Sequence, residues 1–281
     1  TANWVVAGAL AKQLISNISK EYKLGNIIVK ITTSIGIAIY PVAGTEINDL
    51  FKKADIALYR AKHKGKNTFR YYSETLNIEY QRKTFIQTIL RQSLQNEEFY
   101  LLYQPIMDLE TSKIKGVESL IRWNNAELGL LLPSEFIPIA EKSNLMDEIG
   151  LWVIETSCKA YVRWREVLQN KAFLLSINIS PSQLHNKNFE FNLEAIFERY
   201  AIEKSNIILE LTETYFEEQN SNIEGPLDRL YKKGYPIALD DFGTGYSSFS
   251  RLTTLPIKIL KIDRSFICKI GKSKKHEALI K

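Results

Sequence analysis

Apolar positions over residues 1–72 change their spacing three times. Residues 5–18 and 49–62 repeat apolar side chains at helical spacing, so each predicts an amphipathic helix. Residues 27–40 are rich in Ile, Val and Thr and predict a strand pair or one long bent strand, and residues 68–72 predict a final strand. The pattern therefore indicates a small unit of mixed helices and strands.

Residues 73–97 predict a helical connector, with evenly spread polar residues and a partial apolar stripe. From Phe99 onward, short apolar segments alternate with longer helical ones. The expected strands cover residues 99–106, 114–123, 173–179, 207–212, 235–239 and 257–262, and the expected helices cover 134–141, 146–168, 189–200 and 223–233. Such alternation favours a mainly parallel sheet, open or closed into a barrel. A TIM-like barrel contains about eight strands, two more than this pattern provides.

Composition narrows the class of protein rather than its function. The 281 residues suffice for one large or two moderate domains, and 45% hydrophobic with 25% charged residues is typical of a soluble globular protein. A net charge of +5 suits an anionic ligand without indicating a nucleic-acid polymer as partner. Cys158 and Cys268 lack CxxC spacing, so we expect neither a disulfide framework nor a thiolate metal site. No apolar stretch approaches about 20 residues, so we expect no membrane span in this chain.

Two adjacent carboxylates follow the strand expected over residues 235–239. Asp240 and Asp241 stand immediately before a loop that contains Gly243 and Gly245. In parallel α/β folds, ligands gather at the C-terminal ends of strands. Neighbouring anions repel, and proteins keep such a pair mainly where a cation or hydrogen-bond donors neutralise it. The pair alone leaves two interpretations open, a metal site or an acidic turn that caps the next helix.

Polar side chains recur at five of the expected strands. They are Glu118 and Arg122, Asn178 and Ser180, Glu210 and Glu213, Asp240 and Asp241, and Lys261 and Asp263. Each alone has an ordinary explanation, such as a salt bridge, a strand-end cap or a lysine that reaches solvent. Together they favour a site, because the strand ends of a barrel converge and buried carboxylates without a cation are costly. Oxygen ligands suit Mg²⁺ or Mn²⁺ rather than Zn²⁺, and the three histidines lie outside these strands.

Six motifs follow one another in order over about residues 85–271. They are Tyr103-Gln104-Pro105, Glu118-Ser119-Leu120-Ile121-Arg122-Trp123, Asn178-Ile179-Ser180, Glu210-Leu211-Thr212-Glu213, Asp240 through Ser248, and Leu260-Lys261-Ile262-Asp263. This part of the chain resembles the EAL domain, a cyclic-di-GMP phosphodiesterase domain with a TIM-like barrel. The first unit resembles the C-terminal part of a GGDEF domain, through residues 33–38 and 54–62. The resemblance implies an α/β protein, an incomplete TIM-like (β/α) barrel preceded by a partial α+β GGDEF domain.

The resemblance also implies a role for each matched residue. The metal ligands would be Glu118, Asn178, Glu210, Asp240 and Asp241, the catalytic residues Lys261, Asp241 and Glu213, and the substrate contacts Gln104, Arg122 and Asp263. Asp240 would bridge two Mg²⁺ or Mn²⁺ ions, Lys261 would help to activate the attacking water, and Glu213 would hold the glycine-rich loop. Two metals can stabilise both oxygens of an in-line displacement on a phosphodiester. The implied reaction is hydrolysis of cyclic-di-GMP to linear pGpG in bacterial second-messenger signalling.

The chain departs from the family pattern in three ways. Ser119 replaces the alanine of the motif that names the family, a change that we expect to be tolerated. The family continues beyond Lys281 with two more strands that carry a further catalytic glutamate and a glutamine, and the first unit lacks a Gly-Gly-Asp-Glu-Phe run. We expect a partial GGDEF domain over 1–72, a helical connector over 73–97, and an EAL domain over 98–281 without its last two strands. Such an open barrel predicts poor stability and little hydrolysis by the chain alone.

Several functions remain open for an intact parent protein. All expected metal ligands of the chain are retained, which favours an active phosphodiesterase over a sensor that binds cyclic-di-GMP without cleaving it. The first unit is expected to regulate the second or to mediate dimerisation, and cyclase activity is not expected because its residues are absent. The resemblance implies a homodimer through the EAL domain and a cytoplasmic location, with any membrane anchor upstream of this chain.

Overall fold

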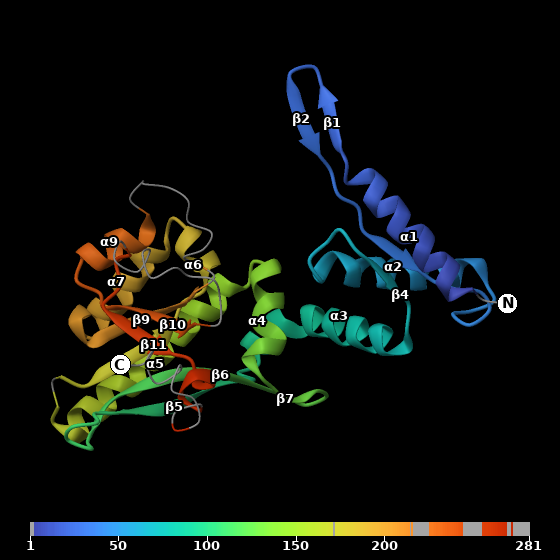
Figure 1. Cartoon of the computed structure of the whole chain (residues 1–281). Helices are drawn as coiled ribbons and strands as arrows, with labels where there is room; N and C mark the ends of the chain where they lie inside the picture. The colour runs from blue at the N-terminus through green and yellow to red at the C-terminus, as the bar shows by residue number, and fades with distance from the viewer. Residues whose placement is uncertain are drawn as a thin grey trace. The chain divides into compact units, whose positions relative to one another are not determined.

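The computed structural model describes residues 3–170, 172–213, 215, 225–243, 255–268 and 271. Internal contacts divide the chain into two compact units, Thr1–Thr88 and Ile89–Lys281. The 22-residue helix α3, Glu74–Gln95, contributes residues to both units and covers most of the expected connector (Figure 1). None of the helices in the described part of the chain is long and apolar enough to cross a bilayer.

Unit 1 contains two short sheets and two helices besides the start of α3. Its elements are α1 (Trp4–Ile18), β1 (Glu21–Leu24), β2 (Ile27–Lys30), β3 (Ile35–Ile37), α2 (Ile47–His63) and β4 (Phe69–Tyr71). Strands β1 and β2 form an antiparallel hairpin that extends from the end of α1 (Figure 1), whereas β3 and β4 pair in parallel. Both expected helices and the final strand are therefore present.

The segment 27–40 differs from the expected strand pair or long bent strand. It contains two short strands that pair with different partners, because the polar run Thr32-Thr33-Ser34 interrupts the apolar pattern. Strand β1 was not predicted, although Glu21-Tyr22-Lys23-Leu24 alternates polar and apolar residues. All four residues are exposed, so the strand buries neither face. Gly36 on β3 packs directly on α2, where a Cβ would lie 2.0 Å from the carbonyl oxygen of Ala54.

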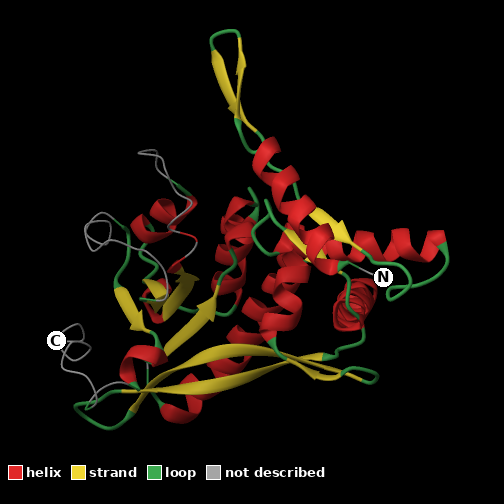
Figure 2. Cartoon of the chain, turned by 45° about the vertical axis from the view of Figure 1, so that its right-hand side comes forward, coloured by secondary structure: helices red, strands yellow, loops and turns green. Residues whose placement is uncertain are grey.

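The described residues of unit 2 form one seven-stranded sheet. Its strands are β5 (Phe99–Met107), β6 (Ile114–Asn125), β7 (Gly129–Leu131), β8 (Leu174–Asn178), β9 (Ile207–Thr212), β10 (Ile237–Phe242) and β11 (Ile259–Ile262). The strand order is β11-β10-β9-β8-β6-β5, with β7 paired to β6. Figure 2 draws the strands in yellow and the helices in red. Strands β6, β8, β9, β10 and β11 run parallel, and β5 pairs with β6 in the antiparallel sense. The parallel strands place their C-terminal ends along one edge.

Helices connect the parallel strands. They are α4 (Pro133–Lys142), α5 (Met146–Leu168), α6 (Pro181–His185), α7 (Phe189–Arg199), the 3-10 turn η1 (Lys204–Asn206) and α9 (Pro226–Lys232), and the short helix α11 (Arg264–Ile267) follows β11. The four expected helices correspond to α4, α5, α7 and α9. The short elements α6, η1, α11 and β7 were not predicted, because three to five residues are too few to show a period.

Candidate metal centre

Three carboxylates from three parallel strands converge in unit 2. Glu118 on β6, Glu210 on β9 and Asp240 on β10 each offer an oxygen, and these oxygens lie within 4.8 Å of one another. Glu210 is 2% exposed, whereas the side chains of Glu118 and Asp240 are 16% and 20% exposed. We call these three side chains the carboxylate cluster. Three anions at this spacing repel strongly unless positive charge lies among them.

Lys261 of β11 provides that positive charge. Its ammonium nitrogen lies 2.5 Å from Oε2 of Glu210, 3.0 Å from Oε2 of Glu118 and 3.2 Å from Oδ2 of Asp240. A single cation thus contacts all three carboxylates. The ammonium group marks the position between them where positive charge is stabilised.

Burial and the neighbouring charges have opposite effects on the pKa values of Glu210 and Lys261. Burial raises the pKa of Glu210 to about 7, because the desolvation of its carboxyl group outweighs the attraction of Lys261. Burial also opposes ionisation of Lys261, but the charges of Glu210, Glu118 and Asp240 outweigh it and raise the pKa of Lys261. Lys261 therefore keeps its proton at neutral pH.

Two side chains of β8 extend the network around the cluster. Asn178 donates a hydrogen bond from Nδ2 to Oε1 of Glu118 at 2.9 Å, which leaves its amide oxygen as the atom suited to a cation. The hydroxyl of Ser176 donates a hydrogen bond to Oε1 of Glu210. Ser176 was not predicted as a site residue, although its position two residues before Asn178 places both side chains on one face of the strand.

Asp240 and Asp241 lie inside strand β10, which continues to Phe242, and not after the strand as expected. The pairing of β10 with β11 shifts between Leu239 and Phe242, and Asp241 has φ of 56°, so the strand bulges at the two acids. The backbone N–H of Asp241 donates to Oδ1 of Asp240 at 3.0 Å. The bulge separates their roles, since Asp240 joins the carboxylate cluster while Asp241 is exposed beside it.

Although Asp241 is exposed, partial desolvation of its carboxyl group raises its pKa, and the negative charges of Asp240 and Asp263 raise it further. A cation next to Asp241 would reverse this effect, because an opposite charge favours the ionised carboxylate. Asp241 is thus placed to hold positive charge close to Asp240, although it does not belong to the carboxylate cluster.

Glu213 and Gly243 are joined at the start of the glycine-rich loop. Glu213 is 3% exposed, and its Oε2 accepts a hydrogen bond from the backbone N–H of Gly243 at 3.2 Å. Gly243 has φ of 99°, a conformation that favours glycine. The rest of the expected loop, residues 244–248 with Gly245, lies outside the described residues.

The three residues expected to contact the substrate lie in three different environments. Gln104 is exposed and pairs directly opposite Glu118 in the antiparallel register of β5 and β6. Arg122 is half-buried and donates from Nη1 to the carbonyl oxygen of the preceding residue at 2.8 Å. Asp263 caps α11, where the N–H of Ser265 donates to it at 2.8 Å, and hydrogen bonds from the side chain and the backbone of Ser265 lower its pKa. Only Gln104 is held beside the cluster by the sheet register itself.

A cavity of about 550 Å³ lies next to the cluster. Glu118, Asn178, Glu210, Asp240 and Asp241 line it together with apolar side chains from α4 and α5, which include Ile137, Pro138, Ile149 and Val153. A mixed lining of this size suits a small organic ligand. The anionic end of the cavity lies at the residues that sequence analysis expected to bind metal.

The donor set of the cluster fits a hard divalent cation. Its three ligand atoms are carboxylate oxygens, the amide oxygen of Asn178 is adjacent, and no histidine or cysteine belongs to the group found in the described residues. Oxygen ligands suit Mg²⁺, Mn²⁺ and Ca²⁺ rather than Zn²⁺. The ammonium of Lys261 shows that the same position stabilises positive charge.

Ser119, the residue that replaces the family's alanine, has a hydrogen-bond partner. The hydroxyl of Ser157 on α5 donates to the hydroxyl of Ser119 at 2.9 Å, and both side chains are buried. The added hydroxyl is therefore satisfied inside the core, which removes the cost of burying it alone.

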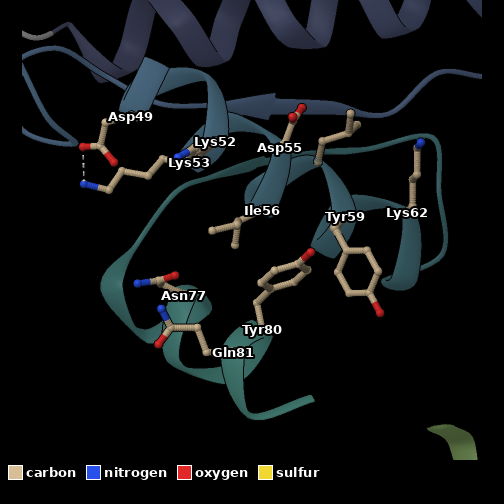
Figure 3. A pocket seen from close by; sticks show the side chains of 11 residues that line it. Asp49, Lys52, Lys53, Asp55, Ile56, Tyr59, Lys62, Asn77, Tyr80 and Gln81 are labelled. Carbon is tan, nitrogen blue, oxygen red and sulfur yellow. Dashed lines mark hydrogen bonds and ion pairs between the residues drawn. The ribbon is translucent and has the colours of Figure 1, made fainter. Parts of the chain in front are cut away.

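Unit 1 contains a second cavity, of about 690 Å³, between α2 and the first turns of α3 (Figure 3). Lys53 pairs with Asp49 at 2.8 Å, and the rings of Tyr59 and Tyr80 meet edge to face at 5.2 Å. Its acids do not form a potential metal group, since the carboxylate cluster of unit 2 is the only one found in the described residues. The potential metal group found in the described residues therefore lies in unit 2.

Two families match the chain. The EAL domain matches residues 87–281, and the family described as "Diguanylate cyclase, GGDEF domain" matches residues 4–68. The EAL match covers more than half of the sequence, so the chain belongs to the EAL domain family, with a GGDEF segment before it. This confirms the resemblance drawn from the six motifs and from the first unit.

Curated relatives carry the same two parts. The "Bifunctional diguanylate cyclase/cyclic di-GMP phosphodiesterase MucR" of Pseudomonas aeruginosa is 34% identical over 275 residues, which cover 98% of this chain and 40% of that protein. The "Signaling protein YkoW" of Bacillus subtilis is 36% identical over 275 residues, which cover 97% of this chain and 34% of that protein. The chain thus spans less than half the length of these relatives.

Solved structures confirm the fold class. The "PaMucR Phosphodiesterase, c-di-GMP complex" superposes with a TM-score of 0.63 at 33% identity, over 69% of this chain and 78% of that chain. The "Structure of EAL Enzyme Bd1971 - cAMP and cyclic-di-GMP bound form" superposes with a TM-score of 0.66 at 33% identity, over 85% of this chain and 62% of that chain. The expected TIM-like α/β architecture with a predominantly parallel sheet is therefore correct.

Proposed function

We propose that unit 2 is a metal-dependent phosphodiesterase domain that hydrolyses cyclic-di-GMP to linear pGpG. The observation that carries the proposal is the convergence of Glu118, Glu210 and Asp240 beside a cavity large enough for an organic ligand. Membership of the EAL family and similarity to a structure described as a c-di-GMP complex support the choice of substrate.

Each residue then has a task that follows from its chemistry. Glu118, Glu210 and Asp240 would hold the first ion with the amide oxygen of Asn178, and Asp240 with Asp241 would hold the second. When bound, Mg²⁺ or Mn²⁺ supplies Lewis-acid charge at the phosphodiester.

In the metal-free protein the nearby carboxylates raise the pKa of Lys261. Its ammonium group would donate a hydrogen bond to the attacking water and so help to position and activate it. Arg122, with its planar fork of donors, and Gln104 would bind the substrate, and Asp263 would contribute a further polar contact. Glu213 would hold the glycine-rich loop through Gly243.

The first unit is proposed to regulate unit 2 or to mediate dimerisation. Under this proposal the chain consists of a partial GGDEF domain over 1–72, a connector over 73–97 and an EAL domain over 98–281. A homodimer formed through unit 2 belongs to the same proposal. Sedimentation of the chain at several concentrations tests for the homodimer, because a dimer predicts a weight-average mass that rises toward twice 32.4 kDa as the concentration increases.

Hydrolysis of cyclic-di-GMP in the presence of Mn²⁺ tests the proposed reaction in the full protein that carries this chain. Substrate and pGpG are separated by chromatography for wild type, Asp240→Asn and Asp108→Asn. Asp240→Asn is expected to lower turnover more than about 100-fold, beyond the loss caused by removal of an outer hydrogen-bond partner. Asp108 accepts a hydrogen bond from Thr111 in a turn, so Asp108→Asn is expected to retain activity.

Two results would change the proposal. Tight binding of cyclic-di-GMP by the wild type without turnover would establish a sensor instead of an enzyme. The 281-residue chain alone is expected to hydrolyse little substrate, because its sheet ends at β5 and β11 in the described residues. Robust turnover by that chain would show that this expectation is wrong.

A further inference from the structure

Ser176 lies behind the carboxylate cluster, on strand β8. Its side chain is 0% exposed, and its hydroxyl donates a hydrogen bond to Oε1 of Glu210. The other carboxylate oxygen of Glu210, Oε2, lies 2.5 Å from the ammonium nitrogen of Lys261. The two oxygens of one buried carboxylate thus have different partners, one behind the cluster and one at its centre.

The sheet register places Ser176 at this position. Ser176 pairs with Glu118 on β6, and Asn178 pairs with Glu210 on β9. Residues two apart on a strand share a face, and paired residues of neighbouring strands share it as well. Ser176 therefore belongs to the same face as both glutamates and Asn178, one step deeper along β8 than Asn178.

We propose that Ser176 is a positioning residue of the metal centre, whose hydroxyl fixes the carboxylate of Glu210 so that Oε2 points into the cluster. The inference rests on the proposed role of Glu210 as a metal ligand. The terminal torsion of a glutamate is broad, so a carboxylate held by packing alone samples many orientations. One donor on Oε1 removes that freedom. Outer hydrogen-bond partners of this kind are known to orient ligands and to raise metal affinity.

The alternative is that Ser176 only satisfies a buried carboxylate and contributes to stability. The two roles predict different results, because a purely structural serine affects unfolding without a selective effect on metal binding. Ser119 is the matched control. It is a serine of the neighbouring strand β6, 2% exposed, and its hydroxyl pairs with Ser157 rather than with a carboxylate.

Binding of Mn²⁺ to the full 281-residue chain tests the proposal. Free Mn²⁺ is followed by its electron paramagnetic resonance signal in titrations of wild type, Ser176→Ala, Ser176→Cys and Ser119→Ala. The dissociation constant is expected to rise about 10-fold in Ser176→Ala, and by less in Ser176→Cys, which keeps a weaker donor of similar size. Ser119→Ala is expected to bind like wild type. Thermal unfolding without metal accompanies each titration, so that affinity is compared among folded proteins.

The outcomes separate this inference from the proposed function. Equal affinity in Ser176→Ala and wild type, or an equal loss in Ser119→Ala, overturns the role of Ser176 and leaves the metal centre standing. Absence of Mn²⁺ binding by a wild-type chain that shows a thermal unfolding transition overturns both the role of Ser176 and the proposed metal centre. If Ser176→Ala fails to fold, Ser176→Cys decides the question, and wild-type affinity in that variant overturns the proposal.

Discussion

The ammonium nitrogen of Lys261 lies 2.5 Å from Oε2 of Glu210, a carboxylate that is only 2% exposed. The pair joins β11 to β9 across β10, which lies between them in the sheet. Asp240 on β10 contacts the same nitrogen at 3.2 Å. Lys261 therefore connects three parallel strands at the edge where the proposed reaction takes place.

Replacement of Lys261 by methionine is expected to destabilise the metal-free chain by about 3 kcal/mol, the order seen when one partner of a buried pair is removed. The loss should be larger at about pH 8 than at about pH 6. Without the attraction of Lys261 the pKa of Glu210 rises further, so Glu210 takes up a proton as the pH falls and then carries no uncompensated charge. Mn²⁺ should restore much of the stability, since it supplies the missing positive charge. Thermal unfolding with and without Mn²⁺ measures both effects.

Lys258→Met is the control for this substitution, because Lys258 is exposed and lies just before the same strand. A loss of stability in Lys261→Met no greater than in Lys258→Met would contradict the role of Lys261 as the internal cation of the cluster.

The hydrogen bonds to Glu98 predict that the stability of the protein decreases at acid pH. It accepts hydrogen bonds from Asn125 at 2.8 Å and from Trp123 at 3.0 Å. Burial opposes its ionisation, but these bonds outweigh burial and hold the pKa of Glu98 below the usual 4.5. A carboxylate whose pKa is lowered by folding stabilises the protein above its unfolded pKa, and this stabilisation is lost as the pH falls.

Glu98→Gln is therefore expected to lose less stability than wild type on acidification from about pH 6 to about pH 3, because glutamine does not titrate. Melting temperatures across this range provide the measurement. Glu97→Gln, a change at the adjacent exposed residue, should follow the wild-type profile. Identical profiles for Glu98→Gln and wild type would refute the prediction.

Two features of the structure at position 243 require glycine. Its φ is 99°, and a Cβ there would lie 2.5 Å from a ring carbon of Phe266. Gly234 has a similar φ of 94° but no atom within 4 Å of such a Cβ. Gly234→Ala is expected to cost about 1–2 kcal/mol for the left-handed conformation, and Gly243→Ala a further 1–3 kcal/mol, approximately, for overpacking. Equal losses in urea unfolding would show that Phe266 moves aside freely.

The two cysteines are expected to differ in reactivity toward a thiol reagent. Cys268 is exposed, whereas Cys158 is buried on α5, and burial raises its pKa to about 12. The native chain should therefore release one equivalent of chromophore rapidly from a disulfide reagent and the second only on unfolding. Cys268→Ser should abolish the rapid phase. A rapid phase that persists in this variant would show that Cys158 is accessible.

The strands of unit 2 could be predicted because most of them are apolar runs that carry a polar residue near the C-terminal end. Glu118, Asn178, Glu210 and Lys261 were expected at one site on this basis, and the sheet brings them together. Ser176 could not be found in this way, since serine inside an apolar strand resembles an ordinary core residue. Its contact with Glu210 depends on the register of β8 against β9, which single-strand patterns do not contain.

Strand β10 is also longer than the sequence predicts. The apolar run stops at Leu239, so the strand was expected to stop there, but backbone pairing with β11 continues to Phe242. Pairing of this kind depends on the neighbouring strand rather than on the side chains of the segment. In unit 1, the hairpin β1–β2 was missed in part because its residues are mostly exposed.

The bulge in β10 has a consequence for how this site tolerates change. Between Leu239 and Phe242 the strand advances three residues while β11 advances two, from Leu260 to Ile262. The extra residue lets two consecutive acids serve different positions. Deletion of either one would restore regular alternation and turn the following side chains to the opposite face of the sheet. The number of residues in this short segment is thus as much a part of the site as their identity, and a one-residue deletion should be as damaging as the loss of a ligand.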